Sequence, residues 1–381
     1  MPERVLIVDD DPLLLASLRR QFRRRLDLDT AASGEEGIRA VRERGPFAVV
    51  VTDYCMPRMN GVEFLKQVRQ LAPETVRVLL TGSADLNAAV RAVNEGNIFR
   101  FLLKPCPAAS LQEVLEEGFR QFRRTRKERK FSRRTRRWLA EAMEVQQGFF
   151  PSGGNRETGL DIAGRSCFCD PTGGDYYDYF DVCREGRRRV VLAVGDVSDH
   201  GLPSALLMAS ARAFLREAAA HAAGAAAVVS EVNRQFSRDV HTSGRFMTLF
   251  YAEIEPDSRR LTWVRAGHEP AWLYDPEKDR FEDLAGEGGL PLGVLPEAGY
   301  AEYQRGYCPG EILLVATDGI WEAQNREGAC FGKAILKDLV RAHAHRGAAE
   351  ILGAVLEELE RFLCPLAIQD DATLLVARLE V

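Results

Sequence analysis

The sequence predicts two folded domains of different class, an α/β domain followed by an α+β domain, joined by a basic helix. In residues 1–120, short apolar runs alternate with amphipathic stretches, whereas in residues 151–381 strand-like runs border turns rich in glycine and aspartate. Between them, the segment from Arg120 to Arg137 contains eleven Lys or Arg and one acid, a net charge of +10. A chain of 381 residues is long for one domain and sufficient for two. We therefore expect domains at 1–120 and 151–381, with a helical linker at 121–150.

In the first domain, short β-branched or apolar runs predict strands, and amphipathic stretches between them predict helices. This alternation indicates a doubly wound, five-stranded parallel sheet with helices on both faces. The expected strands include RVLIV (4–8), FAVVV (47–51), VRVLL (76–80) and IFRFLL (98–103), and the expected helices include 12–22 and 61–71.

Polar side chains follow the ends of these strands. Functional loops in such a sheet lie at the carboxyl ends of its strands. Asp9–Asp11 follow the first strand, Asp53 the third and Thr81 the fourth, and Lys104 follows the fifth. A carboxylate that attacks phosphorus needs a cation to neutralise the incoming phosphoryl oxygens, and a lysine supplies further positive charge. We therefore expect acids, a hydroxyl and a lysine at one edge.

This edge, with VTDYCMPRMNG around Asp53, resembles that of two-component receiver domains, and the resemblance spans the whole segment. The resemblance implies that Asp53 is the phosphoacceptor. It also implies that Asp9 and Asp10 hold Mg²⁺, together with the backbone carbonyl of Cys55.

The same resemblance gives roles to three supporting residues. Thr81 would bond a phosphoryl oxygen, and Lys104 would pair with it. Phe101 occupies the aromatic switch position, although an aromatic ring is also an ordinary core residue. The alternative is a receiver fold that no longer takes phosphate, but every chemical position is filled.

Four aspartate-bearing segments stand in order along the second domain. Each lies beside an apolar run, and glycines allow the tight turns through which distant carboxylates can converge. Such carboxylates repel one another, and hard divalent cations with oxygen ligands keep them ionised. Two ions about 4 Å apart would form a phosphoester hydrolase site. A turn aspartate explains any one segment, but not the ordered set: GGDYYD around Asp175, GDVSDHG around Asp196, ATDG around Asp318, and DDAT at Asp370–Asp371.

The ordered set resembles the metal-dependent PPM family of serine/threonine phosphatases, in the bacterial branch that acts on sigma-factor regulators. The resemblance covers roughly residues 139–381 and implies an α-β-β-α sandwich. It is supported by FMTLFYAEIEP (246–256), AGHEPAWLY (266–274), GGLPLGV (288–294) and GEILLVATDGIWEA (310–323).

By this resemblance, Asp175 and Asp196 lie at the centre of a site for two Mn²⁺ or Mg²⁺ ions, with the backbone carbonyl of Val197 as a further ligand. Asp318 and Asp370 complete the site.

Two details of this resemblance stay open. Asp371 ranks below Asp370, because the family's ligand aligns best with the first residue of the pair. Asp199 stands where the family's GDVSGHG has glycine. It would bind a third ion or face solvent, and we favour solvent.

The basic linker has no proline or glycine in residues 119–147, which favours a continuous helix. Its apolar positions do not keep a heptad through the basic stretch. A solvated connector is the first interpretation, and a helix that transmits the receiver's state by docking or dimerising is the second. Binding to nucleic acid or an acidic membrane is the least favoured. The next segment, WLAEAMEVQQGFFP, resembles the helix that leads into this phosphatase branch.

Composition favours a cytoplasmic protein. No run of about 18 apolar residues suggests a membrane span, and MPERVLIVDDDP leads directly into a strand rather than a signal peptide. The eight cysteines follow no disulfide framework, and no second pair matches Cys167 and Cys169. The six histidines do not cluster with cysteines, and His200 and His268 lie in the phosphatase-like motifs. We therefore expect reduced cysteines, most of them in the core.

Together these patterns predict a response regulator with an enzymatic output. A histidine kinase would phosphorylate Asp53, and this would change the activity of a phosphatase acting on a phosphoprotein, by resemblance an anti-sigma-factor antagonist. One alternative is a phosphorylation-dependent docking protein with a catalytically passive phosphatase fold. Another is a DNA-binding regulator that uses the basic helix, although no helix-turn-helix output is evident. The sequence leaves the substrate, the kinase, the sign of regulation and a homodimer open.

Overall fold

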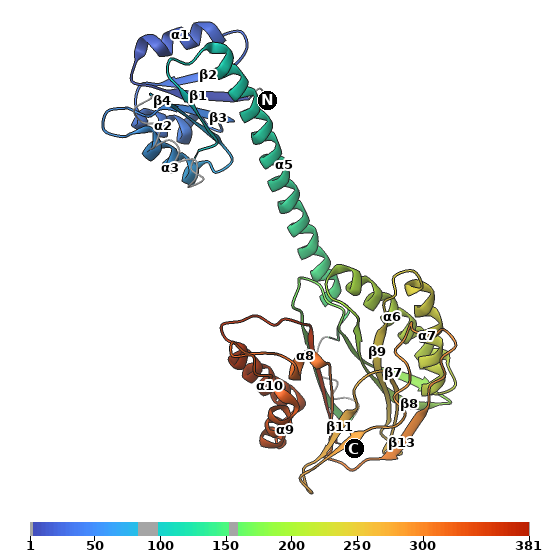
Figure 1. The fold of residues 1–381 in the computed structure, drawn as a ribbon. Helices are drawn as coiled ribbons and strands as arrows, with labels where there is room; N and C mark the ends of the chain where they lie inside the picture. Colours follow the sequence, from blue (N-terminus) through green and yellow to red (C-terminus); the bar gives the residue numbers. More distant parts are fainter. Residues whose placement is uncertain (1–2, 83–97, 152–158, 381) are drawn as a thin grey trace. The chain divides into compact units, whose positions relative to one another are not determined.

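The computed structural model describes residues 3–82, 98–151 and 159–380. The chain divides into two compact units, Met1–Arg136 and Arg137–Val381. Helix α5 (Ala108–Gln147) crosses this division and supplies residues to both units (Figure 1). None of the helices in the described ranges combines the length and apolar character needed to cross a bilayer.

The first unit contains a parallel sheet of five strands, as predicted, and their order is β2-β1-β3-β4-β5. Helices α1 and α5 pack on one face through alternate strand residues such as Val5 and Ile7. Helices α2 and α3 pack on the other face through Leu6 and Val8. The elements are β1 (Arg4–Val8), α1 (Pro12–Phe22), β2 (Asp27–Ala31), α2 (Gly34–Arg44), β3 (Val49–Asp53), α3 (Gly61–Leu71), β4 (Val76–Thr81) and β5 (Arg100–Leu103).

The second unit contains two antiparallel sheets of five strands each. The first has the order β13-β10-β9-β8-β7 and the second β12-β11-β14-β15-β6. Their strands are β6 (Leu160–Cys167), β7 (Tyr176–Arg184), β8 (Arg187–Val197), β9 (Met247–Glu255), β10 (Arg260–Ala266), β11 (Ala271–Asp275), β12 (Arg280–Leu284), β13 (Glu302–Gly306), β14 (Ile312–Ala316) and β15 (Ala372–Leu379).

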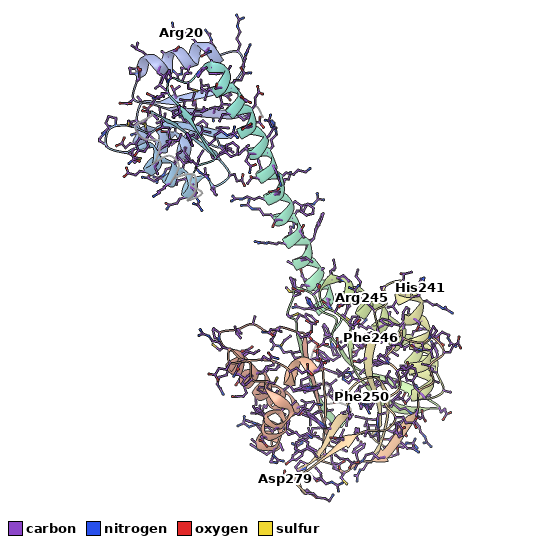
Figure 2. The ribbon with its side chains drawn as sticks, viewed as in Figure 1. Arg20, His241, Arg245, Phe246, Phe250 and Asp279 are labelled. Atoms are coloured by element: carbon purple, nitrogen blue, oxygen red, sulfur yellow. The ribbon has the colours of Figure 1, made fainter. Side chains whose placement is uncertain are left out.

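The two sheets face each other across an apolar core, with helices outside (Figure 1). Phe250, labelled in Figure 2, is buried in this core. Helices α6 and α7 cover the first sheet, and α9 and α10 cover the second. The α-β-β-α sandwich is therefore confirmed. Its helices are α6 (Leu202–His221), α7 (Ala225–Val240), α8 (Asp318–Trp321), α9 (Gly332–His343) and α10 (Ala348–Leu363).

The apolar residues of α5 belong to different environments along its length. Phe119 and Phe122 are buried in the core of the first unit. Phe131 and Trp138, in and just after the basic stretch, are 68% and 50% exposed. Gln146 is buried near the end of the helix, within the second unit. The two ends of α5 are thus fixed by packing, while the basic middle is solvated.

Candidate functional sites

The first candidate site lies at the carboxyl edge of the parallel sheet. Parallel strands end on the same side, so the residues after β1, β3, β4 and β5 meet there. One carboxylate oxygen from each of Asp9, Asp10 and Asp53 lies within 4.8 Å of the other two. Lys104 Nζ lies 2.7 Å from Asp9 Oδ2 and 2.8 Å from Asp53 Oδ1. Four of the predicted residues are therefore brought together.

At this edge, burial and ion pairing shift the pKa values of the charged side chains in opposite directions. Burial raises the pKa of Asp53, and the hydrogen bond and charge of Lys104 offset only part of that rise. Burial lowers the pKa of Lys104, but its hydrogen bonds to Asp53 and Asp9 outweigh this and leave the pKa raised. Lys104 therefore stays charged, as a partner for the acids.

The remaining predicted residues lie in, or just after, strands β3, β4 and β5. Thr81 is buried at the end of β4, and its hydroxyl donates to the Gly82 carbonyl at 3.2 Å. Cys55 is exposed, and half-buried Phe101 packs against the α2–α3 core. Gly61 is required by close packing, since a Cβ there would lie 2.2 Å from the Asp53 carbonyl oxygen.

The second candidate site lies at one edge of the β-sandwich. Asp196 is at the end of β8, and Asp318 is the first residue of α8. Both line a cavity of about 140 Å³, together with residues that include Thr248, His268 and Thr317. Two predicted acids from distant segments therefore face one hollow.

Asp175 is attached to this cavity through Thr317. Its carboxylate is almost completely buried, and Oδ2 accepts a hydrogen bond from Thr317 Oγ1 at 2.8 Å. The hydroxyl of Thr317 in turn accepts from the Thr373 amide at 2.9 Å. Within the described part of the chain, Asp175 Oδ1 has no hydrogen-bond partner. A buried carboxylate oxygen without a donor fits a cation as its missing partner.

Asp370 and Asp371 differ in what their carboxylates do. Asp371 is buried, and its two oxygens accept from the amides of Cys169 at 3.0 Å and Gly174 at 2.8 Å. Asp370 is exposed, and one of its oxygens accepts from the Asp371 amide at 2.8 Å. Asp371 therefore holds the loop before Asp175, which leaves Asp370 as the better candidate ligand.

Backbone packing fixes the turns that carry these acids. A Cβ on Gly174 would lie 2.7 Å from the carbonyl oxygen of Val197, the predicted backbone ligand. A Cβ on Gly319 would lie 1.9 Å from the carbonyl oxygen of Asp371. Gly174 and Gly319, which stand next to Asp175 and Asp318, are thus needed for these chain segments to approach one another.

Burial, and then mutual repulsion, raises the pKa values of these acids. Burial, and then the charge of Asp196, raises the pKa of Asp175 well above its ordinary value. Burial, followed by the charges of Asp318, Asp370 and Asp371, raises the pKa of Asp196 to about 7. Burial also raises that of Asp318, with Glu322 and Asp370 adding to it. Such a set of oxygen donors fits hard divalent cations, which would relieve the repulsion.

The four proposed ligands do not close into one tight cluster. Among the described residues, no three of them have carboxylate oxygens that all lie within 4.8 Å of one another. A two-ion site does not require this, because each ion takes a different subset of the ligands. The charges of both Asp318 and Asp370 act on Asp196 and raise its pKa.

Asp199, which replaces the expected glycine, lies at the surface. It adopts φ of +65°, a left-handed conformation that glycine adopts readily. Its carboxylate is 69% exposed and lies 3.2 Å from Nε of Arg245, which is labelled in Figure 2. A surface ion pair agrees with the preference for solvent over a third ion.

Three residues of this site were not predicted from sequence. Thr317 bonds to Asp175, and Thr248 bonds to His268 at 2.8 Å between Oγ1 and Nδ1. Gln146 brackets Gly173, because its Nε2 donates to the glycine carbonyl at 2.7 Å and its Oε1 accepts from the glycine amide at 3.2 Å. Thr317 lies directly before Asp318, a signal that sequence reading could have used. The Gln146 contact joins segments that only the fold brings together.

The folds and sites together define a receiver domain joined to a PP2C-like phosphatase domain. The family model for the response regulator receiver domain matches residues 5–116. The model described as Stage II sporulation protein E (SpoIIE) matches residues 186–380, half of the chain, and the chain belongs to that family.

Individual relatives agree with this assignment. The chain is 28% identical to phosphoserine phosphatase RsbU of Bacillus subtilis (strain 168) over 240 residues, 63% of this chain and 69% of that protein. It is 40% identical over 101 residues to the hydrogenase transcriptional regulatory protein HoxA of Cupriavidus necator, 26% of this chain and only 21% of that protein. The SiaA-PP2C domain of Pseudomonas aeruginosa shares the fold, with a TM-score of 0.55 and 22% identity over 65% of this chain and 98% of that chain.

Proposed function

We propose that this chain is a response regulator whose output is a metal-dependent protein serine/threonine phosphatase. The observation that carries the proposal is that Asp196 and Asp318 line one cavity, while Thr317 beside Asp318 bonds to Asp175. Carboxylates held in mutual repulsion at a cavity have no structural use, but they suit the binding of cations. Residues 1–120 would be the receiver, 121–150 the linker and 151–381 the phosphatase.

The proposed phosphatase ligands for two Mn²⁺ or Mg²⁺ ions are Asp175, Asp196, the Val197 carbonyl, Asp318 and Asp370. Ions held by these residues would supply Lewis-acid chemistry for phosphoester hydrolysis. Around them, Thr317 orients Asp175, and Asp371 fixes the loop that precedes it. The side chains of the cavity thus position the carboxylates before any substrate arrives.

In the receiver, Asp53 is the proposed phosphoacceptor and a histidine kinase the proposed donor. Asp9, Asp10 and the Cys55 carbonyl would hold Mg²⁺, which neutralises the incoming phosphoryl oxygens. Lys104 lies within 2.8 Å of Asp53 and can move to a phosphoryl oxygen with little change in position. Thr81 would donate to another oxygen, and Phe101 would respond to that movement.

The linker connects the two sites through α5. One end of this helix contributes Phe119 and Phe122 to the receiver core, and the other end contributes Gln146 to the phosphatase domain. Gln146 bonds to Gly173, which lies two residues before Asp175. A shift or rotation of α5 would therefore act on the loop that carries a proposed metal ligand.

The proposed substrate is a phosphoserine or phosphothreonine of another protein. RsbU, by its name, acts on phosphoserine. An anti-sigma-factor antagonist is the substrate that the relationship favours, and the cytoplasm is the compartment where such a partner and a histidine kinase meet.

The deciding experiment measures hydrolysis of a phosphoserine peptide by the full chain with Mn²⁺ or Mg²⁺, with and without beryllofluoride as a phosphoryl mimic. In the wild type, beryllofluoride should change kcat/KM several-fold, on the order of 1–3 kcal/mol of coupling, and we expect activation. Asp53→Asn should keep the basal rate and lose the response. No hydrolysis with either metal would favour the passive docking protein. Equal rates in all four conditions would mean that the receiver does not control the phosphatase.

A further inference from the structure

Cys169, Asp170 and His200 form a cluster that the proposed phosphatase does not use. Cys169 and Asp170 lie between β6 and β7, and His200 lies between β8 and α6. One ligand atom from each residue, the thiol sulfur, a carboxylate oxygen and a ring nitrogen, lies within 4.8 Å of the other two. His200 Nδ1 is 2.7 Å from Asp170 Oδ2. This cluster is not evident from the sequence, because the histidine is distant from the cysteine along the chain.

Both loops of the cluster are held in place by their surroundings. The amide of Cys169 donates to Asp371 Oδ1 at 3.0 Å. Gly201, directly after His200, adopts φ of +79°, and a Cβ there would lie 3.2 Å from Asp170 Oδ2. The turn that carries His200 therefore lies directly against the Asp170 carboxylate, and the two loops approach closely at this point.

The donor atoms of this cluster differ in kind from those of the neighbouring acids. Asp175, Asp196, Asp318 and Asp370 offer only oxygen, which suits Mg²⁺ and Mn²⁺. A sulfur, a nitrogen and an oxygen together suit a borderline cation such as Zn²⁺, which takes three protein ligands and a water in its open sites. The side chains of His200 and Asp170 are 57% and 45% exposed, so a fourth position is open to solvent.

We propose that Cys169, Asp170 and His200 form a zinc-class metal site, separate in chemistry from the oxygen-only sites of this chain. The competing explanation is an ordinary Asp–His ion pair beside an unrelated thiol. The two explanations differ in one observable, since only a metal site brings the Cys169 sulfur and the His200 nitrogen to the same ion.

The test uses the metal-free full chain in excess Mg²⁺, titrated with Co²⁺ as a coloured substitute for Zn²⁺. The wild type should bind one Co²⁺ with a sulfur-to-cobalt charge-transfer band, and Zn²⁺ should abolish that band. Cys169→Ser should lose the band, whereas the matched control Cys167→Ser should keep it. His200→Ala should weaken cobalt binding by more than about tenfold, the loss that even an outer partner of a metal ligand can cause.

Circular dichroism checks that each variant is folded. If Cys169→Ser does not fold, His200→Ala decides the question, since its side chain is largely exposed. Absence of a band in the wild type, a band that persists in Cys169→Ser, or unchanged affinity in His200→Ala would overturn the proposal. Asp196→Asn should keep the cobalt band while losing the proposed hydrolysis, so the zinc-class site and the phosphatase can fail independently.

Discussion

The two acidic sites of this chain differ in the charges that surround their clustered carboxylates. In the receiver, Lys104 lies within 2.8 Å of both Asp9 and Asp53 and supplies a cation from within the protein. In the phosphatase domain, the main charges acting on Asp175, Asp196 and Asp318 come from other acids. The acidic charge of the receiver site is thus partly compensated before metal binds, and that of the phosphatase site is not.

This difference has a physical consequence for metal dependence. A lysine that pairs with the acids leaves room for one Mg²⁺ and an incoming phosphoryl group. Acids that only repel one another gain free energy from each divalent cation that binds them. Metal should therefore stabilise the phosphatase domain more than the receiver domain. Substitutions of the acids should reveal this difference between the two sites.

The largest effect is expected for Asp196→Asn. Asp196 lines the cavity, and the charges of Asp318 and Asp370 both act on it. Its loss should lower kcat/KM by at least about a thousandfold, because the proposed metal site would lose a central ligand. The metal-free protein should keep its melting temperature or gain slightly, since a repelling charge has been removed. Steady-state hydrolysis with Mn²⁺ and thermal unfolding in EDTA measure the two quantities. An active Asp196→Asn, or a wild type indifferent to EDTA, would contradict the two-ion account.

The next largest effects are expected for Asp370→Asn and Asp371→Asn, which should differ from each other. Asp370→Asn should reduce hydrolysis strongly with little change in stability, because its carboxylate is exposed. Asp371→Asn loses one acceptor for the amides of Cys169 and Gly174, and should destabilise the fold by about 1–3 kcal/mol with a smaller loss of activity. Urea unfolding and kinetics on both variants give the comparison. The opposite pattern would make Asp371 the metal ligand.

These sites also show how far the sequence alone could reach. The strands of buried Val, Leu and Ile residues were predictable, and so were the acids at their ends. An apolar run followed by a glycine turn is compatible with few other local structures. The position of the second strand, β2, was not predicted, since DLDTA at the sheet edge contains three polar residues. The bonds from Gln146 to Gly173 and from Thr317 to Asp175 join residues that are distant in sequence. Only the packed fold brings them together.

A moderate effect is expected for Gln146→Leu. Leucine has a similar volume but cannot form hydrogen bonds to the Gly173 backbone. The end of α5 would therefore no longer be hydrogen-bonded through residue 146 to the loop before Asp175. The response to beryllofluoride should shrink towards a ratio of one, while phosphorylation of Asp53 stays intact. Gln147→Leu, at the exposed neighbour, is the matched control and should respond as the wild type does. An undiminished response in Gln146→Leu would place the coupling elsewhere on α5, for example at Trp138.

The smallest effect concerns His268, a neutral group beside the acids of the phosphatase cavity. Burial lowers its pKa to about 4, although the Ala316 carbonyl opposes this. The unfolded chain takes up a proton at its ordinary pKa near 6.5 while the folded protein does not, so stability contributed by neutral His268 is present above that pKa and is lost as the pH falls towards about 4. The loss should reach roughly 1 kcal/mol by about pH 5.5.

The measurement is the difference in unfolding free energy between wild type and His268→Gln, taken at several pH values, because the difference cancels the opposing contribution of the nearby acids. The wild type should lose stability relative to His268→Gln as the pH falls. A flat difference for His268→Gln would mean that this imidazole accepts a proton in the folded protein, and the phosphatase cavity would then contain a cation of its own, as the receiver does.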